Sequence, residues 1–396
     1  MDEAPTPGSP WVPALPATFA SGVSAPTLDE IGPRGVFVPG DFARFARLWK
    51  KLEGGESVRI AAIGGSITAG AGASSSDRCW GRLLCEGLGR AFPGANVDFV
   101  NAGIGATGSN IGAFRLKRDV LDRRPDAVVV EFAVNDSDTE ACAETFEGVV
   151  RQLLLDPRGV AVAILGMCDS GGRNSQDREG EIARHYGVPF VSWRDALYPC
   201  VESGRIKWSD ISPDVVHPND AGHAYAAALL GSLLSQAHAR WASSGHLDPS
   251  ISPVPPPLFG TTFDSGEFLC MKDASIVAND GFFPLEDICW GEGLACTAPG
   301  GRLVFEVDGA TCSLLYRLGN KPFDWGKIDV SVDGRKIACG LDCHGSQSWW
   351  KTPALPLFKN EAGRHRVEVV ALSEKNAESD GFGCHLTGVL ISGGRP

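Results

Sequence analysis

Residues 58–68 read VRIAAIGGSIT, an apolar run of strand type that ends in two glycines and a serine. A continuous apolar run of this length is typical of a parallel strand that is buried on both faces. The glycines allow the chain to turn sharply where the strand ends. Ser66 is therefore expected at the carboxyl edge of a sheet, beside backbone N–H groups. That position suits a nucleophilic hydroxyl, although glycine and serine also form ordinary turns.

A carboxylate and an imidazole lie three residues apart in the segment 212–219, which reads SPDVVHPN. At this spacing Asp214 can reach the ring of His217, fix its tautomer and stabilise the imidazolium that forms when the ring accepts the Ser66 proton. A helical pattern follows. The pair is therefore expected on a loop that enters the last helix of a domain, a usual place for catalytic side chains.

Two further strands end in groups that could bind an oxyanion. Residues 97–108, VDFVNAGIGATG, run into a glycine-rich loop, and another buried strand ends at Asn135. Such loops let backbone N–H groups approach a ligand. We expect the oxyanion hole to combine the Asn135 amide with N–H groups of Ser66 and of the Gly105-Ala106 turn.

Three other polar residues near these motifs are given structural roles. Asp136 is interpreted as an acceptor for nearby backbone N–H groups. Glu131, inside a strand pattern, is interpreted as a buried and paired carboxylate. His223 is interpreted as a packing or surface histidine rather than a substrate group.

In this order the motifs resemble those of the SGNH, or GDSL-type, hydrolases. The matching blocks are GGSIT at 64–68, the glycine block at 101–108, VND at 134–136 and DVVH at 214–217. Each block alone is weak, but four in the family's order, over roughly residues 55–235, are specific. The resemblance implies a three-layer α/β/α domain with a mostly parallel sheet. It also implies ester hydrolysis by a Ser66, His217 and Asp214 triad, with no metal or other cofactor.

Two departures from the family pattern bear on the site. The serine block reads GGSI rather than GDSL, as in some carbohydrate-esterase-like branches. Ala106, preceded by Gly105, stands where the glycine block would supply its N–H donor. A backbone donor needs no side chain, so either residue can serve.

Apolar strands alternate with helical patterns through the first part of the chain, which favours a parallel sheet covered on both faces. The strands are predicted at 58–63, 97–101, 127–133, 160–166 and 188–191, and the helices at about 79–91, 111–123, 140–155, 176–186 and 220–238. The predicted domains are an N-terminal extended arm (1–45), a catalytic domain (46–245), a proline-rich linker (246–257) and a β-sandwich (258–396).

The last predicted domain shows a period of two, as in the runs 302–307, 311–318 and 327–332. Asp333-Gly334 follows the third run and is a hairpin turn signal. Without a long helical pattern, this part is expected to be an all-β sandwich of jelly-roll type. Trp325, Trp349 and Trp350 are candidates for stacking on a sugar ring, with core packing the favoured alternative.

Composition excludes several partners. A net charge of −12 over 396 residues argues against a nucleic-acid binder, which would need basic faces, and fits an uncharged ester better. No apolar run approaches the ~20 residues needed to span a bilayer. Residues 1–10 lack the features of a secretion signal, so the expectation is a soluble cytoplasmic protein, or a secreted or periplasmic one if a signal was removed.

Twelve cysteines occur without any C-x-x-C spacing, and most lie in apolar patterns. Reduced, buried thiols are the favoured interpretation, with a disulfide or two in the C-terminal part as the alternative. A metal cluster of Cys339, Cys343 and His344 is disfavoured because a fourth ligand at a suitable spacing is missing.

Polar residues after the fourth predicted strand flank the expected cleft. Asn174, Gln176 and Asp177 could hydrogen-bond a sugar, although a solvated loop is the favoured alternative. The function predicted is a serine esterase that removes short acyl groups, acetyl above all, from an oligo- or polysaccharide. The alternatives are a short-chain lipase or thioesterase, an acyltransferase to sugar, and a carbohydrate-binding protein with a vestigial hydrolase domain.

Overall fold

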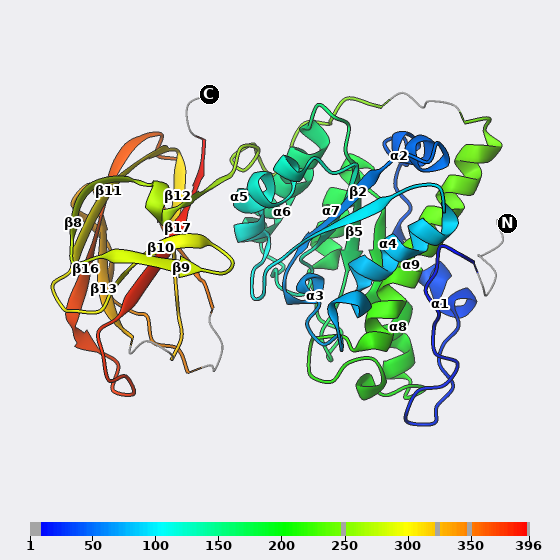
Figure 1. Cartoon of the computed structure of the whole chain (residues 1–396), viewed down its shortest axis with the longest axis horizontal. Coiled ribbons are helices and arrows are strands. Elements are labelled where there is room, and N and C mark those ends of the chain that lie inside the picture. The colour runs from blue at the N-terminus through cyan, green and yellow to red at the C-terminus, as the bar shows by residue number, and fades with distance from the viewer. Residues whose placement is uncertain (1–8, 247–250, 321–324, 347–350, 394–396) are drawn as a thin grey trace. The chain divides into compact units, whose positions relative to one another are not determined.

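The computed structural model describes residues 9–246, 251–320, 325–346 and 351–393 (Figure 1). The chain divides into two compact units. One comprises Met1–Gly112 and Arg118–Thr261, and the other comprises Ala113–Lys117 and Thr262–Pro396.

The first unit is built on a sheet with strand order β1-β6-β5-β4-β2-β3. Strands β2 to β6 pair in parallel, and β1 pairs antiparallel with β6 at one edge. The predicted mostly parallel sheet is therefore confirmed, with β1 as an addition that the pattern did not indicate. The strands are β1 (Val36–Val38), β2 (Val58–Gly64), β3 (Val97–Gly103), β4 (Ala127–Glu131), β5 (Ala161–Gly166) and β6 (Phe190–Ser192).

Helices cover both faces of this sheet, which makes the three layers that the sequence predicts (Figure 1). On one face α4 and α9 pack together over a core that includes Ile60 and Ala62, and on the other α6 packs beside α7. The longer helices are α1 (Leu28–Gly35), α2 (Phe45–Glu53), α4 (Trp80–Ala91), α5 (Ser109–Asp119), α6 (Glu140–Leu155), α7 (Gln176–Tyr186), α8 (Trp193–Glu202) and α9 (Asp220–Ser243). The short ones are α3 (Ser66–Ala69), η1 (Ser76–Arg78), η2 (Leu121–Arg123) and η3 (Trp208–Asp210).

The described part of the segment 1–45 is not wholly extended, in contrast to the prediction, because it contains the helix α1. Helix α1 forms despite an internal proline, Pro33. Ile31 is fully buried, and the missing side chain of Gly35 lets the helix end approach Leu229 and Ala196. Burial of one apolar face therefore outweighs the poor helix propensity of this stretch.

The second unit is an antiparallel β-sandwich, as predicted. One sheet has the order β15-β12-β17-β10-β9, with β7 also paired to β17, and the other has the order β14-β13-β16-β11-β8. The elements are β7 (Glu267–Cys270), η4 (Met271–Asp273), β8 (Ser275–Asp280), β9 (Phe283–Asp287), β10 (Gly291–Cys296), β11 (Arg302–Gly309), β12 (Thr311–Tyr316), β13 (Gly326–Val332), β14 (Arg335–Asp342), β15 (Ala354–Phe358), β16 (Gly363–Lys375) and β17 (Cys384–Ser392).

Local details of the sandwich also follow the sequence. Asp333 and Gly334 both have positive φ, 50° and 78°, which is the hairpin turn expected between β13 and β14. Trp325 is buried in the sandwich core, so it presents no ring for a sugar. Trp349 and Trp350 lie outside the described residues.

The described part of the proline-rich linker is bound to the α/β unit. Arg151 donates to the Pro255 carbonyl at 3.1 Å, and the His185 ring meets the Pro256 carbonyl at 2.7 Å. Just beyond, Glu147 accepts the N–H groups of Leu258 and Phe259 at 2.6 and 2.7 Å. The predicted domain boundaries themselves stay predictions.

None of the twelve cysteines, which all lie within the described residues, forms a disulfide, and most of them are buried. Within the described residues no group of three or more His, Cys, Asp or Glu side chains could hold a metal ion. None of the described helices is both long and apolar enough to cross a bilayer.

Candidate active site

The sequence motifs meet where the strand order reverses. Strand β3 lies on one side of β2 and β4 on the other, so the carboxyl ends of β2 and β4 flank a topological switch point. Ser66 follows β2 directly, and Asn135 follows β4. Crevices at such points are the usual binding sites of open α/β sheets. The topology therefore brings two of the predicted site residues to one edge.

A chain of two hydrogen bonds joins Ser66, His217 and Asp214. The Ser66 hydroxyl lies 2.9 Å from His217 Nε2, and His217 Nδ1 lies 2.8 Å from Asp214 Oδ2. Because the carboxylate can only accept from Nδ1, the ring carries its proton there and presents Nε2 to the hydroxyl. This is the geometry by which an imidazole removes the proton of an attacking alcohol.

Asp214 also organises the loop that carries the imidazole. Its Oδ1 accepts the N–H groups of Val216 and His217 at 2.8 and 2.7 Å. Partial desolvation alone would raise the pKa of Asp214, but these N–H groups and the His217 ring outweigh it, so the pKa is lowered. Asp214 is therefore ionised at neutral pH, as an acceptor for Nδ1–H must be.

The close packing around Ser66 explains the glycine before it. A Cβ on Gly65 would lie 2.0 Å from Asn135 Oδ1, so the amide rests against the serine loop. Neither glycine before Ser66 has a positive φ, and a Cβ on either would collide with a neighbour, so both are needed for close approach. Gly65 thus admits Asn135 to the edge where an oxyanion would form.

The glycine loop reaches the same place. A Cβ on Gly105 would contact Ser66 Cβ at 3.9 Å, so this residue flanks Ser66. Ala106 has φ 56°, in the left-handed region that favours glycine. A non-glycine residue held there is backbone strain of the kind that clusters at functional sites.

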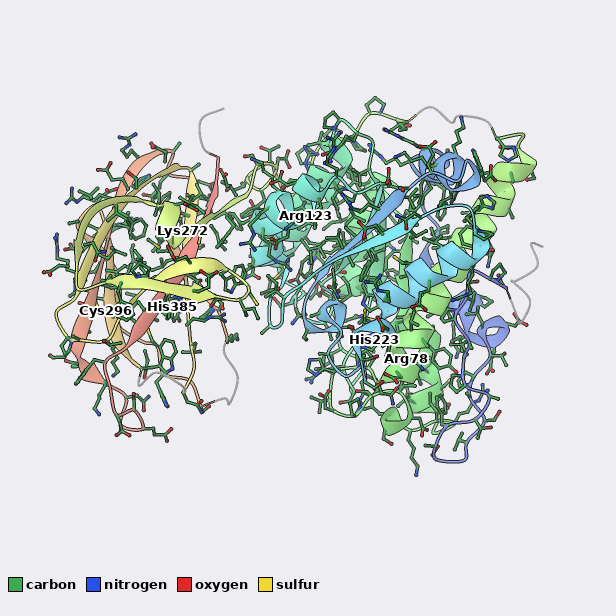
Figure 2. All side chains as sticks on the ribbon, in the orientation of Figure 1. Arg78, Arg123, His223, Lys272, Cys296 and His385 are labelled. Atoms are coloured by element: carbon green, nitrogen blue, oxygen red, sulfur yellow. The ribbon has the colours of Figure 1, made fainter. Side chains whose placement is uncertain are left out.

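His223 supports the loop opposite His217. It is fully buried on α9 (Figure 2), where Nδ1 accepts the Trp80 N–H at 3.3 Å and Nε2 meets the Ala71 carbonyl at 3.1 Å. Burial lowers the pKa of His223 to about 4, so the ring is neutral. Gly72, which follows Ala71 in the chain, has no room for a Cβ because the Pro218 carbonyl would lie 2.2 Å away. His223 is a packing histidine, in agreement with its interpretation from sequence.

The three weaker substrate-binding candidates do not join this cluster. Gln176 is fully buried and bonds to Ser192 and Asp195. The Asn174 amide donates to the Met167 carbonyl at 2.8 Å, and its oxygen accepts from Arg194 at 2.9 Å. Asp177 is exposed and paired with Arg194. Gln176 is therefore neither a sugar contact nor part of a solvated loop, and both interpretations are corrected for it, because its buried amide holds the start of α7 to α8.

Comparison with known proteins shows which family the chain is similar to. The profile of the GDSL-like Lipase/Acylhydrolase family matches residues 62–225. A two-domain esterase (CEX) active on acetylated mannans, co-crystallised with mannopentaose, is 31% identical to this chain. The match covers 92% of this chain and 98% of that one, with a TM-score of 0.84.

The chain belongs to the GDSL-like lipase/acylhydrolase family. It is a carboxylic ester hydrolase. A second structure of the same esterase gives the same TM-score and identity over 99% of its chain. An acetyl xylan esterase, AlAXEase, is 20% identical, with a TM-score of 0.37 over 44% of this chain and 98% of that one. No curated protein matches the chain.

Sequence reasoning gave Glu131 no functional role in this GDSL-like hydrolase. The structure places it at the end of β4, fully buried, where the Thr68 hydroxyl donates to its Oε2 at 2.8 Å. Its only signal in the sequence is a charged residue at the end of an apolar strand pattern.

Proposed function

We propose that this protein is a serine esterase that removes acetyl groups from an acetylated oligo- or polysaccharide. The observation that carries the proposal is the hydrogen-bonded series Ser66, His217 and Asp214 at the switch point of the sheet. The acetyl and saccharide parts are supported by the esterase active on acetylated mannans, which this chain resembles over almost its whole length.

The geometry supports a two-step acyl transfer. His217 Nε2 accepts the Ser66 proton as Oγ attacks the ester carbonyl, and Asp214 stabilises the imidazolium. The tetrahedral oxyanion is bound by the N–H of Ser66, the Gly105-Ala106 backbone and the Asn135 amide. The imidazolium then protonates the leaving sugar hydroxyl. Water enters, loses its proton to His217, and releases acetate while Ser66 regains its hydrogen.

Acetate release from acetylated mannan, xylan and pectin tests the substrate class. We expect release from at least one of these polymers, with mannan first, and a fall in rate along p-nitrophenyl esters from acetyl to decanoyl. Faster turnover of the long esters would favour the lipase alternative. Glycan binding without any ester turnover would contradict the proposal and favour a vestigial hydrolase domain.

The proposed role of Asn135 predicts a loss of rate rather than of binding. Replacing it with alanine removes one oxyanion donor, so kcat on p-nitrophenyl acetate should fall about 10²–10³-fold with KM little changed. The exposed position of the residue should leave the melting temperature near that of the wild type. A kcat within threefold of wild type in the alanine variant would remove Asn135 from the oxyanion hole.

A further inference from the structure

Three buried carboxyl groups lie directly behind the proposed oxyanion loops. Glu131 ends β4, Asp136 follows Asn135, and Glu179 lies on α7. One oxygen of each, Oε1, Oδ2 and Oε2 respectively, is buried and has no hydrogen-bond partner among the described residues. Buried acids of this kind are costly for a fold, so a cluster of three calls for a compensating role.

The other oxygen of each acid is bonded to a loop of the proposed site. Glu131 accepts the Thr68 hydroxyl at 2.8 Å. Thr68 lies two residues after Ser66, in the short helix α3. Asp136 accepts the Ser109 N–H at 2.8 Å, where the glycine loop enters α5.

Glu179 extends the network to the asparagine loop. Its Oε1 lies 2.9 Å from Ser175 Oγ, and the Ser175 hydroxyl and N–H donate to the Ala133 carbonyl at 3.0 and 2.8 Å, so a protonated Glu179 donates to Ser175 Oγ. Ala133 lies between Glu131 and Asn135. Each of the loops that would supply an oxyanion donor is therefore tied to one of the three acids.

We propose that Glu131, supported by Asp136 and Glu179, is a positioning residue that holds the Ser66 and glycine loops in the arrangement an oxyanion requires. The inference rests on the proposed esterase function and deepens it. Glu131 acts through the Thr68 hydroxyl and does not touch the substrate.

Burial and mutual repulsion oppose the charges of these acids, so Glu131 is largely protonated near neutral pH. Burial raises the pKa of Glu131 to about 8 and that of Asp136 to about 7, and the pKa of Glu179 is raised by burial and then by Asp136. Among the described residues, the titratable groups that raise the pKa of Glu179 are Asp136, Glu131 and the Cys142 thiol. As the pH rises past the pKa of Glu131, a negative charge forms behind Ser66 and opposes the developing oxyanion.

Replacing Glu131 with glutamine separates the effect of its hydrogen bond to Thr68 from the effect of its negative charge. E131Q keeps an acceptor for Thr68 but cannot ionise. With initial rates of p-nitrophenyl acetate hydrolysis corrected for spontaneous hydrolysis from pH 5 to 9.5, we expect a wild-type kcat that falls above about pH 8. In E131Q, kcat at pH 7 should stay within about threefold of wild type and the alkaline fall should be absent.

Two variants remove the hydrogen bond between Glu131 and Thr68, which is called the anchor below. E131A, or T68V if E131A does not fold, should lower kcat about 10–100-fold with KM nearly unchanged, since a small misplacement of reacting groups is costly. Glu147→Gln is the matched control: this other buried glutamate bonds to Tyr186 and the linker, and its kcat and pH profile should equal those of the wild type.

The inference is overturned if E131Q retains the wild-type alkaline fall, or if the anchor variants keep wild-type kcat. Its failure is distinct from failure of the esterase proposal. If Ser66→Ala is inactive while E131Q matches the wild type at every pH, only the positioning role of Glu131 is excluded. If Ser66→Ala is active, the serine esterase function itself is excluded.

Discussion

Replacing Ser66 with alanine should reduce kcat on p-nitrophenyl acetate by about 10⁵-fold or more while KM changes little. Without the hydroxyl, no acyl-enzyme can form, and only the oxyanion donors and binding remain to accelerate attack by water. The alanine methyl fits the space of the serine, and the backbone N–H of residue 66 is retained. The measurement is steady-state kinetics, with intact-mass detection of the acetyl-enzyme as a second readout.

Ser203 provides the matched control for this variant. It lies on the surface after α8, where its hydroxyl donates to the Pro199 carbonyl at 2.8 Å. Ser203→Ala should retain the wild-type kcat, and its level of acetyl-enzyme should equal that of the wild type. Turnover by Ser66→Ala within tenfold of wild type would exclude this residue as the nucleophile, and an acetyl adduct elsewhere in the chain would identify its replacement.

The central sheet could be predicted from sequence because its signals are local. Apolar runs bounded by glycine or polar residues define β2, β3, β4 and β5, and helical patterns between them require parallel pairing. Parallel pairing in turn places every strand's carboxyl end at one edge. The meeting of Ser66 and Asn135 there follows from strand type alone.

Elements whose stability comes from distant packing left no such signal. Helices α1 and α8 each contain an internal proline, Pro33 and Pro199, so their local propensity is poor. Both form because one face is buried, as Ile31 and Leu197 show. Strand β1 has only three residues and pairs with a strand more than a hundred residues later. Tertiary contacts, which no short window contains, decide these cases.

The same reason explains why the partners of two buried polar residues could not be predicted from the sequence. Gln176 follows a loop rich in polar residues, yet its partners Ser192 and Asp195 lie 16 and 19 positions further on. Glu131 is separated from Thr68 by 63 positions. A buried polar side chain reveals its role only through the group that satisfies it.

Asp214→Asn should reduce kcat by about 10⁴-fold, although it changes one oxygen to a nitrogen. The orientation of the new amide is dictated by the loop. Oδ1 accepts two backbone N–H groups, from Val216 and His217, so the amide oxygen must take that place, because an NH₂ group there would face two donors. The nitrogen then faces His217 Nδ1.

An amide NH₂ in that position donates to Nδ1, so the ring proton moves to Nε2. A protonated Nε2 cannot accept the proton of the Ser66 hydroxyl, which lies 2.9 Å away. The base is then blocked while the fold is kept, so the melting temperature should change little. Asp220→Asn is the matched control, since Asp220 also accepts a backbone N–H and a side-chain hydroxyl, both from Ser74 and neither from His217. It should keep kcat within a few-fold of wild type. Equal activity in the two variants would mean that the tautomer of His217 does not govern the reaction.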